Sequence, residues 1–176
     1  RRRYGWNEIL INSSSYKKRP DSFAGLFFCT IFAITKVCIM TLKDFLNSGD
    51  KFAASNGISL QEIAEDYARA TMVVTDKHSN AGGVCQGGAI FTLADLVFAA
   101  LVNSRGYLSF AISSTIYYHL SGNMGDTLIA EGRFLQNHPK IPAAEVVVKN
   151  QDGAHIATFT AQGYSKKVEN KFDSLM

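Results

Sequence analysis

Several features that would assign a class of protein are missing or scarce in this sequence. Its 176 residues contain only three cysteines, Cys29, Cys38 and Cys85, which form neither a paired framework nor a C-x-x-C motif. We therefore expect no structural disulfides or zinc, and a reducing compartment, the cytoplasm. The apolar run at residues 23–35 is too short for a membrane-spanning helix, which needs about 20 residues. We do not expect a membrane protein.

A basic face for nucleic acid is also missing, although the net charge is +3. Residues 1–36 hold seven Lys or Arg against two acids, which leaves eleven basic and thirteen acidic residues elsewhere. The glycine-rich stretch at 82–88 lacks the Lys-Ser/Thr of a phosphate-binding loop, and the four histidines show no H-x-x-x-H spacing. We expect no nucleic-acid partner and no metal site.

The length fits one well-cored domain, which we place at residues 40–176. Residues 1–39 differ from it, because they are polar and basic as far as Asp21 and apolar from Phe23 to Thr35. We interpret them as an N-terminal extension that is poorly ordered or not native, with Met40 as the natural start. An export or membrane signal and a docking segment are the alternatives, although no small-residue cleavage site follows the apolar run.

What the sequence does contain is a helix that is apolar on nearly every side, predicted from Gln86 to Ser104. Such a helix can lie only inside a protein. Its middle carries one carboxylate, Asp95, which in that setting must be hydrogen-bonded, paired, protonated or catalytic. Gly87 and Gly88 open the helix without side chains, so backbone N–H groups and the positive end of the helix dipole face a ligand oxygen.

Strands are predicted on both sides of this helix. A short helix at 41–48 and a turn at 52–55 precede strands at 58–64 and 67–75, and further strands are expected at 108–120, 127–137, 143–150 and 155–165. Long antiparallel strands around one buried helix indicate an α+β fold. Since such a sheet leaves an edge strand exposed, we expect a dimer whose two sheets join edge to edge.

The stretch from His78 to Asp95 resembles the phenylacetic-acid-degradation (PaaI) type of hotdog-fold acyl-CoA thioesterases. In that family an Asn precedes a His-Gly-Gly by six positions, and a catalytic carboxylate follows nine positions after the His. The matching residues here are Asn80, Gly87, Gly88 and Asp95, with Gln86 in place of the His. The resemblance covers roughly residues 55–166 and implies a hotdog fold, an antiparallel sheet wrapped around one long central helix. It also implies an acyl-CoA substrate, a tetramer of two dimers, and no cofactor beyond the coenzyme A of the substrate.

The resemblance assigns roles to these residues. Asp95 is expected to act as general base or nucleophile, and the Gly87 N–H to polarise the thioester carbonyl. Asn80 either orients the water or the loop, or only forms a turn with its own backbone. Gln86 and Gly88 are expected at the substrate. Eight helical residues span about 12 Å, so one carbonyl cannot reach Gly87 and Asp95 of the same helix, and the two groups must come from different chains.

Two hydroxyl residues on the strand after the helix are further candidates. Ala111, Ser113, Thr115 and Tyr117 are expected to share one face by the two-residue period of a strand. Some members of the family place a Ser or Thr in this region to hold the attacking water, so Ser113 is the first candidate and Thr115 the second. Two ordinary strand residues are an equally good interpretation.

The predicted function is hydrolysis of an acyl-CoA thioester to a carboxylic acid and free coenzyme A, with the acyl group unspecified. A second enzymatic interpretation, a hotdog hydratase, is disfavoured because no His stands in a dehydratase-like setting. A non-catalytic acyl-CoA-binding or regulatory protein is the alternative from another class, because the carboxamide of Gln86 cannot exchange a proton as a His can. Cys85 is not expected to be a nucleophile, since no His is placed to activate it. Possible partners of the coenzyme A phosphates are Arg105, Arg133, Lys140, Lys166 and Lys167.

Overall fold

The structure is a computed structural model that describes residues 40–169, so the predictions for residues 1–39 lie outside the described residues. Its elements in chain order are α1 (Leu42–Gly49), α2 (Lys51–Ser55), β1 (Ser59–Ala64), β2 (Tyr67–Val73), the 3-10 turn η1 (Asp76–His78), α3 (Gly87–Asn103), β3 (Tyr107–Tyr118), β4 (Thr127–Gln136), β5 (Ala143–Lys149) and β6 (His155–Glu169). Every predicted helix and strand is present with similar bounds, whereas η1 was not predicted. None of the described helices is long and apolar enough to cross a membrane.

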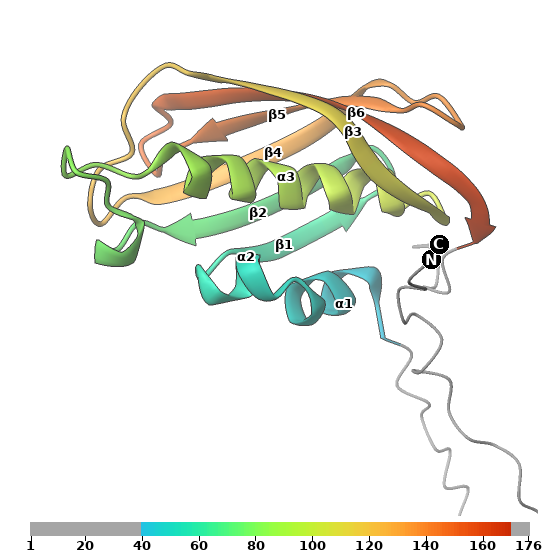
Figure 1. Ribbon diagram of the computed structural model, residues 1–176, viewed down its shortest axis with the longest axis horizontal. Coiled ribbons are helices and arrows are strands. Elements are labelled where there is room, and N and C mark those ends of the chain that lie inside the picture. The colour runs from blue at the N-terminus through green and yellow to red at the C-terminus, as the bar shows by residue number, and fades with distance from the viewer. Residues whose placement is uncertain (1–39, 170–176) are drawn as a thin grey trace, which may run out of the picture. The chain divides into compact units, whose positions relative to one another are not determined.

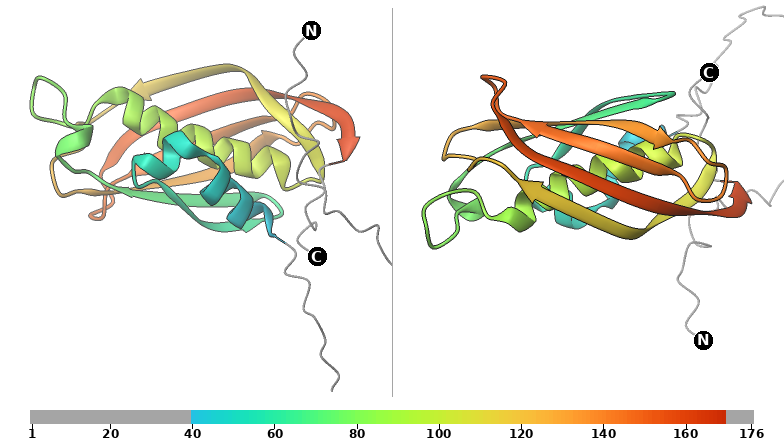
Figure 2. Two further views of the ribbon diagram at one scale, coloured as in Figure 1. Left: turned by 60° about the horizontal axis from the view of Figure 1, so that its bottom comes forward. Right: turned by 90° about the horizontal axis from the view of Figure 1, so that it is seen from above.

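One antiparallel sheet in the order β1-β2-β4-β5-β6-β3 curves around α3 (Figure 1), which confirms the expected α+β hotdog arrangement. The helix contacts all six strands. In the view from above, α3 runs beneath the sheet along its length (Figure 2). The core is made by the inward-facing residues of the strands and by the buried positions of α3, which are Ile90, Leu93, Ala94, Leu96, Val97, Phe98, Ala100, Leu101 and Val102.

Two glycines let the helix approach the sheet closely. A Cβ at Gly132 on β4 would lie 2.7 Å from Cγ1 of Val97, and one at Gly163 on β6 would lie 3.4 Å from Cζ of Phe98. Phe98 also packs edge-on against Phe159, with ring centroids 6.4 Å apart. The absence of a side chain at Gly132 therefore sets how deeply α3 sits in the sheet.

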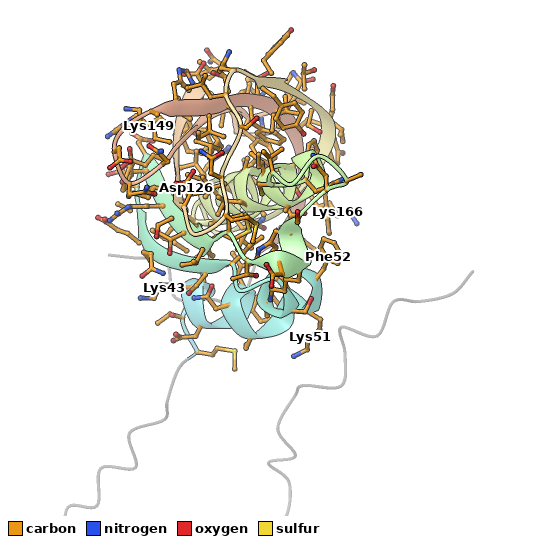
Figure 3. All side chains as sticks on the ribbon, turned by 90° about the vertical axis from the view of Figure 1, so that its left-hand side faces the viewer. Lys43, Lys51, Phe52, Asp126, Lys149 and Lys166 are labelled. Atoms are coloured by element: carbon orange, nitrogen blue, oxygen red, sulfur yellow. The ribbon has the colours of Figure 1, made fainter. Side chains whose placement is uncertain are left out.

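The edge of the sheet at β1 is covered by the N-terminal helices. Asn47 of α1 uses both ends of its carboxamide on Leu60: its Nδ2 donates to the Leu60 carbonyl at 3.1 Å, and its Oδ1 accepts from the Leu60 N–H at 2.8 Å. Thr41 caps α1 and Asp50 caps α2. From the end at which α3 begins, α1 and α2 lie beneath the rest of the fold (Figure 3). Part of this edge is thereby covered within the chain.

The opposite edge, β3, is open. Within the described residues β3 pairs only with β6, although it is a strand of 12 residues. Large apolar side chains stand exposed along it, among them Ile112 (58 % exposed), Tyr117 and Phe110. A long apolar edge of this kind is usually covered or paired in natural proteins.

We expect Gly132→Ala to destabilise the fold by about 1–3 kcal/mol, because the new methyl group would overlap the stiff, β-branched side chain of Val97. Chemical denaturation would measure the change. The double variant with Val97→Ala is the control, because it makes room for the methyl group. It should lose less stability than the sum of the two single variants, and strict additivity would contradict the close packing described here.

Candidate active site

The start of α3 is capped by Gln86. Its side-chain Oε1 accepts hydrogen bonds from the N–H groups of Gly88 and Ala89, while its own N–H donates to the His78 carbonyl at 2.7 Å. The residue that replaces the family His therefore satisfies two of the four N–H groups that every helix leaves unpaired at its start. Gln86 also occupies the Gly88 amide, so Gly88 offers no free N–H to a ligand.

Gly87 keeps its own N–H free. Within residues 40–169 this N–H has no hydrogen-bond partner, and the residue is half-buried. Its carbonyl accepts a hydrogen bond of 2.8 Å from the hydroxyl of Tyr118, the last residue of β3. A Cβ at Gly87 would lie 2.9 Å from that hydroxyl oxygen, and the backbone there does not have a positive φ. A side chain at Gly87 would therefore force the Tyr118 ring to shift, whereas the backbone conformation itself would accept one.

Asp95 lies eight residues further along α3, on a stripe that the sheet leaves uncovered. The stripe consists of Gly88, Thr92, Asp95 and Ala99, spaced three or four residues apart and exposed or half-buried, while the core positions around them are buried. The Asp95 carboxylate has no hydrogen-bond or ion-pair partner in the described part of the chain. Burial raises the pKa of this carboxyl above its ordinary value, and the nearby carboxylate of Asp50 raises it further.

The loop before α3 is held by its own residues. Oδ1 of Asn80 accepts from the N–H of Gly82 at 2.8 Å and of Val84 at 3.4 Å, which is the turn-forming role that was one of its two predicted interpretations. His78, in the turn η1 of this loop, is buried. Its Nδ1 accepts from the Thr75 N–H, so its Nε2 donates to the Asn56 carbonyl at 2.9 Å. His78 thus anchors the loop, and nothing in its spacing indicated this.

The hydroxyl residues of β3 do not lie as expected. The register shifts between Ala111 and Ser113, so a bulge breaks the single face that these residues were predicted to share. Ser113 pairs with the exposed Gln162 and Thr115 pairs with Thr160, on the face of the sheet turned away from α3. Ser114 is opposite the buried Ala161 and faces α3. The bulge moves the strand by one residue, which the alternation of polar residues could not indicate.

Other reactive groups are differently placed. Cys85 is buried next to the start of α3, and burial raises the pKa of its thiol, which makes it a poor nucleophile. Among residues 40–169, no three His, Cys, Asp or Glu side chains come close enough together to hold a metal ion.

Four of the five basic residues considered for the coenzyme A phosphates lie over aromatic rings. The pairs are Arg105 over Phe134 (5.7 Å to the ring centroid), Arg133 over Tyr67 (4.9 Å), Lys140 over Tyr164 (5.7 Å) and Lys166 over Phe110 (5.0 Å). Figure 3 shows Lys166 and Phe52 on one side of the molecule, with Asp126 and Lys149 on the opposite side.

Comparison with known proteins identifies the family. The model of the thioesterase superfamily matches residues 82–157, which include the start of α3 and Asp95. A protein of Archaeoglobus fulgidus named "putative esterase" is 36% identical over 146 residues, 83% of this chain and 93% of the relative. The chain belongs to the thioesterase superfamily. It is a thioester hydrolase of the PaaI type, because the acyl-coenzyme A thioesterase PaaI of Escherichia coli is 31% identical over 115 residues, 65% of this chain and 82% of that protein.

Solved structures agree with this thioesterase assignment. The E. coli PaaI protein from the phenylacetic acid degradation operon superposes with a TM-score of 0.66 and 27% identity, covering 74% of this chain and 98% of that one. A Streptococcus mutans protein bound to acetyl-CoA has a TM-score of 0.62 and 28% identity, covering 64% and 91%. The hotdog fold predicted from the sequence is thereby confirmed.

Because the pKa of Asp95 is raised, we expect its negative charge to lower the free energy of unfolding. A raised pKa means that the folded protein holds the proton more tightly than the unfolded chain, whose pKa is near 3.8. The charge of Asp95 therefore destabilises the fold increasingly as pH rises through the raised pKa, and fully above it. We expect Asp95→Asn to raise stability at pH 7–8 by about 0.5–2 kcal/mol, with the gain vanishing below pH 4.

Asp126→Asn is the matched control for thermal unfolding measured from pH 4 to 8. Hydrogen bonds from Gln151 (3.0 Å) and the Asn123 N–H (2.8 Å) lower the pKa of Asp126. Its charge therefore stabilises the fold at neutral pH, and its replacement should lower the melting temperature there. A loss of stability in Asp95→Asn at neutral pH would show instead that Asp95 is a structural carboxylate.

Proposed function

We propose that this thioester hydrolase acts on acyl-CoA, cleaving it to a carboxylic acid and free coenzyme A in the cytoplasm. The observation that carries the proposal is the Asp95 carboxylate, half-buried on the uncovered stripe of α3, with a raised pKa and no partner in the described residues. A carboxylate in this state is prepared to take a proton. The names of two relatives support the substrate: the E. coli thioesterase acts on acyl-coenzyme A, and the S. mutans protein is bound to acetyl-CoA.

Water and two groups of the protein are sufficient to balance the proposed reaction. Asp95 takes a proton from water as the water oxygen attacks the thioester carbon, and the Gly87 N–H stabilises the charge that develops on the carbonyl oxygen. The carbon–sulfur bond then breaks, and Asp95 returns the proton to the coenzyme A sulfur. In the other route open to the same pair of groups, the Asp95 carboxylate attacks the thioester carbon, and the carbon–sulfur bond breaks to release the coenzyme A thiolate. Water then hydrolyses the resulting anhydride to free Asp95 and the carboxylic acid, whose proton goes to the thiolate. Activity should fall in both cases as pH drops through the raised pKa of Asp95.

Each site takes its two groups from different chains. Gly87 and Asp95 are separated by about 12 Å along α3, so they cannot both lie within about 3 Å of one reacting carbonyl. Two α3 helices placed antiparallel along their uncovered stripes would bring Gly87 of one chain to Asp95 of the other. The dimer we propose pairs the two β3 edges, and two such dimers form the expected tetramer. Ser114, the hydroxyl of β3 that faces α3, is then a better candidate than Ser113 or Thr115 for holding the water.

Mixed dimers test this composite site. Asp95→Asn removes the base and should lower kcat by about 10²–10⁴-fold. Gly87→Pro removes the N–H at the first helical position, where proline fits the backbone, and its ring also displaces the Tyr118 hydroxyl in the same altered site. A dimer of one Asp95→Asn chain and one Gly87→Pro chain contains one intact and one doubly altered site. Co-expressed with two affinity tags and purified on both, it should show about half the wild-type release of free thiol from an acyl-CoA panel.

The controls are the two homodimers, which should be inactive while remaining folded and dimeric by circular dichroism and light scattering. An inactive mixed dimer would place both groups in one chain and contradict the composite site. Wild-type protein that binds acyl-CoA without releasing thiol, unchanged in Asp95→Ala, would identify a non-catalytic binding protein instead.

Gln86→His tests the departure from the family pattern. Because Gln86 caps α3 through Oε1, we expect its role to be structural and the wild-type enzyme to be active without a histidine. Gln86→His should then change kcat by less than about tenfold, and Gln86→Ala should cost about 1 kcal/mol of stability from the lost cap. Steady-state kinetics and thermal unfolding would measure these effects. A much larger gain in kcat for Gln86→His would show that this site lacks a proton-transfer group.

A further inference from the structure

We infer that Tyr118 is a positioning residue that holds the Gly87 N–H in place for the reaction, an inference that rests on the proposed function. Tyr118 is the last residue of β3, and its pairing with the buried Ala157 puts its side chain on the face of the sheet that covers α3. No sequence pattern indicated this role, because Tyr118 lies 31 residues from Gly87 and outside the stretch from His78 to Asp95 that carries the family resemblance.

The peptide between Gly87 and Gly88 is fixed at both of its polar groups by side chains. The Tyr118 hydroxyl donates to its carbonyl at 2.8 Å, and Gln86 Oε1 accepts from its N–H. The preceding peptide is fixed as well, since the Gln86 carbonyl accepts from the Ala89 N–H at 3.0 Å. Both peptides that flank the Cα of Gly87 are therefore held, and the Gly87 N–H is the group left over for a ligand.

Fixing this N–H matters because a hydrogen bond to a developing oxyanion is most effective when its donor needs no reorientation during the reaction. A helix start frays easily, and two consecutive glycines increase its freedom. The bond from Tyr118 counteracts both effects from outside the helix. Burial raises the pKa of Tyr118, so its hydroxyl keeps its proton and remains a donor throughout the pH range of the enzyme.

The packing at Gly87 supports the same role. Any Cβ there would approach the Tyr118 oxygen to 2.9 Å and its Cζ to 3.0 Å, so the tyrosine can keep this position only beside a residue that has no side chain. Tyr118 also stands on the edge strand that we propose as the dimer contact. Pairing of two β3 strands would hold the tyrosine, and through it the helix start, in the assembled enzyme.

The test compares Tyr118→Phe with Tyr117→Phe. Both remove one hydroxyl from neighbouring exposed tyrosines of β3, but Tyr117 pairs with Thr158 on the face turned away from α3. We expect Tyr118→Phe to lower kcat by about tenfold with KM changed less than about twofold, because the oxyanion contact forms fully only in the transition state. Tyr117→Phe should leave both constants unchanged.

A second measurement does not depend on activity. Hydrogen exchange of the Gly88 and Ala89 amides, followed by NMR in the assembled protein, should accelerate in Tyr118→Phe and not in Tyr117→Phe. A double-mutant cycle adds specificity: since Gly87→Ala already displaces the tyrosine, Tyr118→Phe should have little further effect in that background.

The outcomes separate the two proposals. Wild-type protein that releases no thiol would overturn the proposed function, while the exchange measurement would still decide whether Tyr118 holds this peptide. Active wild-type enzyme with an unchanged kcat in Tyr118→Phe would overturn the positioning role alone. Equal losses of kcat in Tyr118→Phe and Tyr117→Phe, or a lower melting temperature with unchanged kcat, would also overturn it, because either result describes a purely structural contact.

Discussion

The fold depends on the burial of one helix, α3, whose side chains are apolar around nearly its whole circumference. A single curved sheet covers most of that circumference, and α1 and α2 cover a further part. What remains is the stripe of Gly88, Thr92, Asp95 and Ala99, half-buried or exposed within the described residues. A carboxylate on this stripe is neither fully hydrated nor compensated by a partner, and its raised pKa follows directly. The electrostatics of the candidate site are therefore a consequence of how the helix is packed.

The two edge strands of the sheet, β1 and β3, differ in how they are covered, and this difference is relevant to assembly. At β1 a single carboxamide, that of Asn47, pairs with both backbone groups of Leu60, and α1 covers that part of the edge. At β3 a longer and more apolar strand has no such cover in the described part of the chain. Edges are usually protected unless they serve an interface. The difference between the two edges thus favours β3 as the contact of the proposed dimer, on the side where the stripe of α3 is open.

The sequence alone was sufficient to predict the helices and strands, because each is determined by a local pattern of residues. Continuous apolar residues predicted α3 to within a residue at each end, and alternation predicted the strands. The details of the site depend on contacts between distant residues, and these were not predictable in the same way. The bulge at 111–113 moved Ser113 and Thr115 to the other face of the sheet, His78 is buried by contacts to Thr75 and Asn56, and Tyr118 reaches Gly87 across 31 residues.

Gln86 shows how a departure from a family pattern can be reinterpreted once contacts are known. From the sequence alone, a carboxamide in place of a histidine left open whether activity is retained, because a carboxamide cannot exchange a proton. In the structure the same carboxamide accepts from two amides at the helix start, which is a stabilising role that requires no proton transfer.

Among the polar groups of α3, the Gly87 N–H and the Asp95 carboxylate have no hydrogen-bond partner in the described residues. A sequence selected for stability alone would pair or replace the Asp95 carboxylate, since a partly desolvated charge costs free energy. The neighbouring polar groups, in contrast, have hydrogen-bond partners. Gln86 accepts from the N–H groups of Gly88 and Ala89, and Tyr118 donates to the Gly87 carbonyl. The partly desolvated carboxylate is thus the exception in an otherwise apolar helix, and it is one of the two groups that the proposed hydrolysis uses. Under the proposed function, the distance of about 12 Å between them along one helix requires that each site take its two groups from two chains.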